Sequence, residues 1–223
     1  MLERKDGVET RKRILGAASL EFGRKGFRDT TVADICRLAG TNIASVNYHF
    51  GDKERLYVEA WRQSFQRSHE LHPPDGDVPD GASPEERLRG WICSTIARVV
   101  DTTCHDFEII HKEMANPTGL LAEAMRTSVE PIQRILAGIL RDLLGEKASD
   151  EDIRLCEMSV HSQCVNPRLF AKRFRTPEKK RSLSGPPFPD LDPEMIADHV
   201  TRFSLAGLGE VRRHIETRES GRK

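Results

Sequence analysis

Between residues 42 and 49 the chain carries small, polar and aromatic side chains that could contact DNA. Amide and hydroxyl groups hydrogen-bond to base edges, and small apolar groups contact the methyl group of thymine. The candidate base-contacting residues are Asn42, Ile43, Ala44, Ser45 and Asn47. Tyr48 and His49 can donate to phosphates or pack on sugars. Thr31 and Lys53, on either side, can supply a hydroxyl and a cation to the phosphate backbone.

Two short helices joined by a tight turn must position these side chains. Thr31 and Asp34 have the spacing of a capping box, which begins a first helix. Ala39-Gly40 ends it, because glycine accepts the left-handed conformation that often follows a helix. Asn42 then caps a second helix that runs to about Phe50. The pattern predicts a helix-turn-helix whose second helix enters the major groove.

Simpler structural roles are open for two of these residues. Tyr48 could be a core residue under the turn, and Asn42 could be a helix cap only. Asn47 depends on the facing of the helix, since a shift of one position would turn it toward the protein.

Several short motifs occur in order within the first 60 residues. They are TRKRILGAA at Thr10 to Ala18, FGRKGF at Phe22 to Phe27, TTVADI at Thr30 to Ile35, AG at Ala39-Gly40 and YHFGDKERL at Tyr48 to Leu56. This set resembles the DNA-binding domain of the TetR family of bacterial transcriptional regulators. A helix-turn-helix alone is weakly specific, but the ordered set is highly specific. The second helix departs from many members at Asn47, where an aliphatic or aromatic residue often stands.

The charge distribution fits a DNA-binding segment near the N-terminus. The formal net charge of the 223-residue chain is zero, yet residues 1 to 28 hold eight Lys and Arg against four acids. Such a run is usually an ordinary solvated helix face. Beside the helix-turn-helix it indicates contact with the phosphate backbone.

The sequence predicts an all-α protein in two domains, because no segment alternates at period two. Residues 8–68 form a three-helix DNA-binding domain, whose first helix spans about Thr10 to Lys25. Residues 69–84 are a linker by composition, and residues 85–216 form a helical ligand-binding and dimerisation domain. The helices of the second domain are expected at about 85–101, 104–115, 120–144, 150–165 and 192–216. Residues 174–190 form a second loop.

The C-terminal part resembles the CecR-like branch of the family. HKEMANPT at His111 to Thr118 and SVHSQC at Ser159 to Cys164 carry this resemblance. It implies a pocket for a small-molecule effector. The candidate lining residues are Trp91, Thr95, Phe107, Ile110, His111 and Met114. For each of them a plain core position is the alternative.

The resemblance also implies a homodimer, formed by the last two long helices. Small residues in the final helix permit close approach of the backbones, and larger ones supply apolar area. The candidate interface residues are Met195, His199, Val200, Phe203, Ala206 and Gly207. The alternative is that this face packs within one chain.

The cysteines do not predict a metal site or a cofactor. Cys156, His161 and Cys164 could be proposed as ligands, but they do not share one helix face, and tight zinc sites need four ligands. Buried structural thiols are therefore expected. Reduced thiols and the lack of a membrane-spanning apolar run place the protein in the cytoplasm, away from membranes.

The sequence predicts a DNA-binding transcriptional regulator, expected to be a ligand-responsive repressor on a palindromic operator. An enzyme is disfavoured, since no nucleophile elbow, P-loop, dinucleotide-binding or zinc-protease motif occurs. An architectural DNA-binding protein that responds to no ligand is the alternative. It predicts poor sequence preference, whereas a regulator predicts a palindrome.

Overall fold

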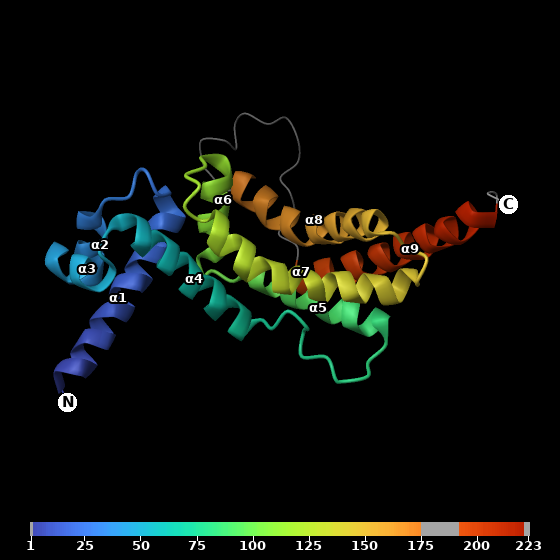
Figure 1. Ribbon diagram of the computed structural model, residues 1–223, viewed down its shortest axis with the longest axis horizontal. Helices are drawn as coiled ribbons and strands as arrows, with labels where there is room; N and C mark the ends of the chain where they lie inside the picture. The colour runs from blue at the N-terminus through green and yellow to red at the C-terminus, as the bar shows by residue number, and fades with distance from the viewer. Residues whose placement is uncertain (1, 175–191, 221–223) are drawn as a thin grey trace. The chain divides into compact units, whose positions relative to one another are not determined.

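The computed structural model describes residues 2–174 and 192–220, and within these ranges it contains nine helices and no strand (Figure 1). The helices are α1 Leu2–Lys25, α2 Val32–Ala39, α3 Ile43–Phe50, α4 Lys53–Leu71, α5 Pro84–Val100, α6 Asp106–Ala115, α7 Ala122–Leu144, α8 Asp150–Phe174 and α9 Pro193–Ser220. The predicted all-α class is confirmed. Except for Phe174, the loop expected at 174–190 lies outside the described residues. No helix in the described ranges is long and apolar enough to cross a bilayer.

Three helix limits differ from the expected ones. α1 begins at Leu2 rather than at about Thr10, and it includes Asp6 and Gly7 without interruption. α8 continues beyond Val165 to Phe174 and contains Pro167. α9 runs to Ser220 rather than to about 216. Helix ends without a strong cap are poorly defined by sequence alone.

The helices divide into two compact units, which we call unit 1 and unit 2. Unit 1 comprises residues 1–71 and 102–130, and unit 2 comprises residues 72–101 and 131–223. The division passes through α7, between Glu130 and Pro131. The domain limits expected at 8–68 and 85–216 stay a prediction, and the structure adds that α6 packs within unit 1.

The core of unit 1 is built on aromatic residues of α1 and α4. Phe22 and Tyr57 are almost fully buried, and their ring centroids lie 4.8 Å apart in an edge-to-face arrangement. Trp61, one turn after Tyr57, is also buried. Ile35 from α2 and Val46 from α3 complete this core, so both helices of the helix-turn-helix rest on α1 and α4.

α1 and α6 approach closely at Gly23. A Cβ atom at this position would lie 3.1 Å from the Cβ of Glu108 and 3.5 Å from the Cβ of His105. The first of these contacts would be tighter than most in a close-packed interior, and the second would be an ordinary van der Waals contact. Gly23 therefore permits α6 to lie directly against α1.

Unit 2 packs α5, the second half of α7, α8 and α9 around an aliphatic core. The segment between α4 and α5 is held against α5 rather than extended. The Oγ of Ser94 donates to the carbonyl of Pro73 at 2.6 Å, and His72 and Asp101 are joined at 2.9 Å. α5 begins with the predicted cap, since Ser83 and Glu86 form a capping box.

Candidate nucleic-acid interface

The turn between α2 and α3 is fixed by the predicted caps. The Oγ of Thr31 accepts from the backbone N–H of Asp34 at 3.1 Å, and Gly40 adopts the left-handed conformation with φ 61°. At the start of α3 the Oδ1 of Asn42 accepts from the N–H of Ser45 at 2.9 Å and from its hydroxyl at 3.2 Å. These local bonds satisfy amides that a helix leaves unpaired, and so they define the turn.

Asp34 also ties α2 to the end of α1. Its carboxylate accepts from the Nζ of Lys25 at 2.9 Å and from the Nη2 of Arg37 at 2.6 Å. The Lys25 ammonium and then the Thr31 hydroxyl lower the pKa of Asp34 to about 2. The carboxylate is therefore ionised at neutral pH and holds the helix-turn-helix to α1.

α3 presents one face to the core and the other to solvent. Val46 and Phe50 are buried, whereas Tyr48 is 85% exposed and Ile43 is 53% exposed. The solvent-facing set also includes Asn42, Ala44 and Asn47, while Ser45 and His49 are half-buried. The exposure of Tyr48 excludes the core position considered for it. The base contacts themselves stay a prediction.

The two predicted phosphate-contacting residues lie in different surroundings. Thr31 is exposed, and its hydroxyl group is engaged with Asp34 in the capping box. Lys53 is half-buried, with its Nζ 4.3 Å from the ring centroid of Phe27, and this burial lowers its pKa. A phosphate would therefore compete with an aromatic ring for the Lys53 ammonium.

Arg11 of α1 contacts Phe50 at the end of α3, the proposed recognition helix, and the sequence did not reveal this role. Its guanidinium lies 5.1 Å from the ring centroid of Phe50 and forms an ion pair with Glu59. Lys12 and Arg13, its neighbours, are exposed. At least one cation of the basic N-terminal run thus has a structural role. The position of Arg11 within the motif TRKRIL was the only sequence signal for this role.

The predicted effector-pocket residues divide between the two units. Trp91 and Thr95 are buried in unit 2, where the Trp91 ring centroid lies 6.3 Å from that of His161 on α8. The other four are on α6 in unit 1: Phe107 and Ile110 are half-buried, and His111 and Met114 are exposed. A common pocket for the six stays a prediction.

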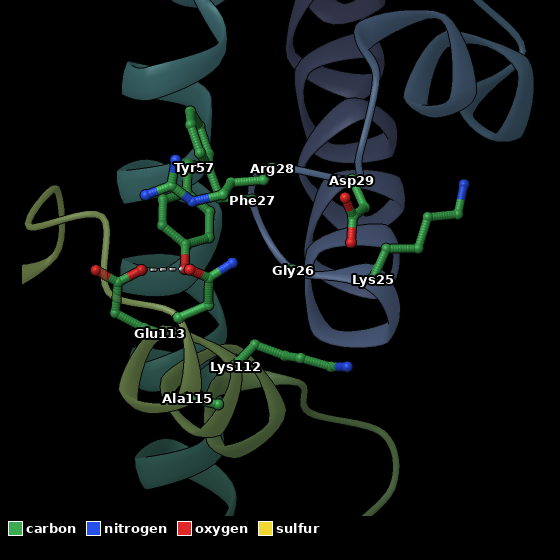
Figure 2. Close-up of a pocket in the computed structure, with 10 residues that line it drawn as sticks. Lys25, Gly26, Phe27, Arg28, Asp29, Tyr57, Lys112, Glu113 and Ala115 are labelled. Carbon is green, nitrogen blue, oxygen red and sulfur yellow. Dashed lines mark hydrogen bonds between the residues drawn. The ribbon is translucent and has the colours of Figure 1, made fainter.

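Unit 1 contains a pocket of about 190 Å³ that the sequence did not indicate (Figure 2). It is lined by residues 25–29, Tyr57, Lys112, Glu113, Ala115 and Asn116. The Tyr57 hydroxyl points at the Glu113 carboxylate from the opposite wall (Figure 2). This pocket lies between the end of α1 and the end of α6.

The predicted dimer-interface residues are mostly exposed along α9. Met195 and Phe203 are each 62% exposed, and His199, Ala206 and Gly207 also face solvent. Val200 differs, because it is 4% exposed and packs in the core of unit 2. Leu155 and Met158 of α8, which the sequence did not single out, are 53% and 62% exposed.

All five cysteines are free thiols, and four of them are buried. Burial raises the pKa of the Cys164 thiol to about 12 and also raises that of Cys156. A raised pKa suppresses the reactive thiolate. Among residues 2–174 and 192–220, no three His, Cys, Asp or Glu side chains gather as a metal site.

Comparison with known proteins matches both parts of the chain to regulators. The model of bacterial regulatory proteins of the TetR family matches residues 14–60. The model of the C-terminal domain of the HTH-type transcriptional dual regulator CecR matches residues 84–208, more than half of the chain.

Relatives and solved structures agree with these models. The chain is 26% identical over 181 residues to the HTH-type transcriptional dual regulator CecR of Shigella flexneri, covering 75% of the chain and 77% of that protein. It is 36% identical over 97 residues to the HTH-type transcriptional regulator TtgR of Pseudomonas putida, covering 44% and 46%. A TetR-like transcriptional regulator from Rhodococcus sp. RHA1 shares the fold with a TM-score of 0.66 at 17% identity, covering 90% of this chain and 96% of that one.

These proteins are transcriptional regulators that bind DNA, and not enzymes. The motifs of the first 60 residues and of the C-terminal part predicted the same assignment. The chain belongs to the TetR family of bacterial transcriptional regulators, with a C-terminal domain of the CecR type.

Proposed function

We propose that the protein is a ligand-responsive repressor that binds a palindromic operator as a homodimer in the cytoplasm. The observation that carries the proposal is the two-sided character of α3. Val46 and Phe50 fix the helix in the core, while Asn42, Asn47 and Tyr48 stand in solvent. A helix held in this way can place amide side chains against base edges in the major groove.

Exposed apolar side chains on α8 and α9 support the homodimer. Leu155, Met158, Met195 and Phe203 are each more than half exposed. Large apolar side chains exposed on these two helices are available for contact with a second copy of the chain. Specific DNA sites bury roughly 1,000–2,500 Å² of protein surface, and a two-fold dimer reaches this by presenting two recognition helices.

The effector would act by changing how well the two recognition helices fit the operator. An effector that prefers the non-binding state by about 1–3 kcal/mol is sufficient to weaken operator binding measurably. Trp91 and Thr95 are the candidates in unit 2, and Phe107, Ile110, His111 and Met114 are those on α6. The aromatic and aliphatic character of this set supports a ligand with a large apolar part.

Selection of bound sites from random duplex DNA tests the proposal. The full chain, purified without nucleic acid, is incubated with the duplex pool at near-physiological salt. Enrichment of a palindrome is expected, with half-sites whose centres lie one or more helical turns apart. Sedimentation of the complex then gives the number of protein copies on each site.

Two other outcomes would contradict the proposal. Salt-sensitive binding without sequence enrichment would favour the architectural alternative. An enriched site without dyad symmetry, bound by one copy, would contradict the homodimer while leaving sequence-specific binding in place.

A further inference from the structure

Hydrogen bonds join α4 to the two ends of α6. At the start of α6 the backbone N–H of His105 donates to the Oγ of Ser64 at 2.8 Å. At its end the hydroxyl of Tyr57 donates to the Oε2 of Glu113 at 3.0 Å. Because 57 and 64 are seven residues apart, both side chains leave α4 on the same face. α6 is thus held along its length, and Gly23 of α1 supports it from another side.

Glu113 accepts hydrogen bonds from two separate parts of unit 1. Besides Tyr57, its carboxylate receives the backbone N–H groups of Thr118 and Gly119 at 2.8 and 3.0 Å. The Thr118 hydroxyl donates to it as well, at 2.8 Å. The Glu113 residue is only 8% exposed, so these donors replace water around a buried charge. One carboxylate therefore closes the turn after α6 and also holds α4.

Tyr57 lies near the end of α4 that follows the recognition helix. α3 ends at Phe50 and α4 begins at Lys53, so Tyr57 is about 6 Å along the axis from the start of α4. Ser64 is about 16 Å from the same point. The Tyr57 ring also contacts the ring of Phe27, at 5.1 Å between centroids. The Lys53 ammonium lies over the same Phe27 ring.

We propose that Glu113 is a positioning residue that couples the turn at residues 116–119 to the recognition helix through Tyr57. If Thr118 and Gly119 move and the Glu113 carboxylate moves with them, its hydrogen bond from the Tyr57 hydroxyl is broken. Loss of that acceptor frees the start of α4, and with it the short connection to α3. This proposal rests on the proposed function and names a route by which the DNA-binding state is controlled.

A matched pair of substitutions on α4 tests the route. Tyr57→Phe keeps the ring and the turn after α6 but removes the bond to Glu113. Ser64→Ala removes the corresponding bond at the start of α6, in the middle of α4. Amide hydrogen exchange is measured on the full-length free protein, together with affinity for the selected operator and for a non-specific duplex at one salt concentration.

For Tyr57→Phe we expect exchange at residues 43–57 to rise about tenfold, the equivalent of one lost hydrogen bond. Operator affinity should fall by about the same factor, while non-specific affinity changes less than about twofold, because phosphate contacts tolerate small shifts. Ser64→Ala should leave residues 43–57 at the wild-type rate. Glu113→Gln, whose amide can still accept from the turn and donate to the Tyr57 oxygen, should give an intermediate result.

Wild-type exchange at residues 43–57 in both Tyr57→Phe and Glu113→Gln would overturn the proposal. Equal effects of Tyr57→Phe and Ser64→Ala would also overturn it, because they would indicate general loss of stability. The exchange measurement needs no DNA. If no operator is selected, the proposed function fails. Hydrogen exchange at residues 43–57 still shows whether Glu113 and Tyr57 hold this segment.

Discussion

Buried polar side chains fix the backbone of unit 1 at defined points, whereas the interior of unit 2 is mainly aliphatic. In unit 1 the fully buried Thr30 donates to the carbonyl of Gly26, and the Ser19 hydroxyl donates to the carbonyl of Ala60. In unit 2 the buried Thr201 donates within its own helix, to the carbonyl of Ala197. Aliphatic cores tolerate changes of side chain if volume is kept, but a satisfied polar contact specifies one geometry.

The difference fits two of the tasks proposed for the molecule. A surface that reads base edges must hold several donors and acceptors in fixed positions. A surface that binds a second copy of the chain, as proposed for unit 2, needs shape and apolar area. We therefore expect unit 2 to change more freely among relatives than unit 1, and substitutions in the two units should differ in kind.

The largest effect is expected for a charge placed on the apolar face of α9. Phe203→Glu would bring a carboxylate into the proposed dimer contact, so the dissociation constant of the dimer should rise by at least about 100-fold, roughly 2.7 kcal/mol. Leu20→Glu is the control, because Leu20 of unit 1 is also exposed, at 41%. Sedimentation equilibrium measures both. A dimer of unchanged strength in Phe203→Glu would place the interface elsewhere.

Removal of one amide from α3 should affect base preference. Asn47→Ala is expected to cost about 1–3 kcal/mol at a single operator position and to relax the preference there. Lys53→Gln should instead weaken binding to all sequences and lower the salt slope by about one. Binding to operator variants at several salt concentrations distinguishes the two. An unchanged preference in Asn47→Ala would remove Asn47 from the base-contacting set.

Matched threonine substitutions compare the interiors directly. Thr30→Val keeps the shape but leaves the carbonyls of Gly26 and Glu21 without their donor, which should lower the free energy of unfolding by about 1–2 kcal/mol. Thr201→Val loses only a bond to a carbonyl within its own helix, and a change within about 0.5 kcal/mol is expected. Urea denaturation measures both variants. Equal losses would refute the contrast between the units.

The smallest effect concerns acid stability. The pKa values of Asp34 in unit 1 and Asp152 in unit 2 are both lowered to about 2, from an ordinary 3.8. Each carboxylate therefore stabilises the fold fully above about pH 4, and this contribution is lost as the pH falls toward 2. Asp34→Asn and Asp152→Asn should each flatten that part of the stability curve.

Salt should separate these two carboxylates. The Lys25 ammonium is the main cause of the shift at Asp34, whereas the Ser149 hydroxyl is the main cause at Asp152. At about 1 M salt the charge–charge part is screened. The difference between wild type and Asp34→Asn should shrink more than that for Asp152→Asn, as followed by thermal unfolding at pH 3 and pH 6. An equal response to salt would contradict this assignment of causes.

Local signals predicted much of unit 1 from the sequence. The capping box at Thr31 operates over three residues, as does the one at Ser83 in unit 2, so the residues involved are close together in the chain. The facing of α3 followed from its cap at Asn42 and from the apolar positions Val46 and Phe50. For this reason the helix-turn-helix and its exposed face could be predicted.

Long-range contacts account for what could not be predicted. The bonds that hold α6 to α4 join residues 41 and 56 positions apart, and no periodicity marks them. Burial of Lys53 over Phe27 likewise depends on tertiary packing. Val200 was grouped with the exposed face of α9 because its apolar side chain suits either surroundings, and packing places it inside.

The two tyrosines differ in exposure, so chemical modification of tyrosine can report on α3. Tyr48 and Tyr57 are the only tyrosines in the chain, and one is 85% exposed on α3 while the other is 1% exposed. Burial and the Glu113 carboxylate raise the pKa of the Tyr57 phenol, so reagents that attack the phenolate should spare it. A nitrating reagent would thus modify Tyr48 in preference to Tyr57, and a bound duplex should slow that modification.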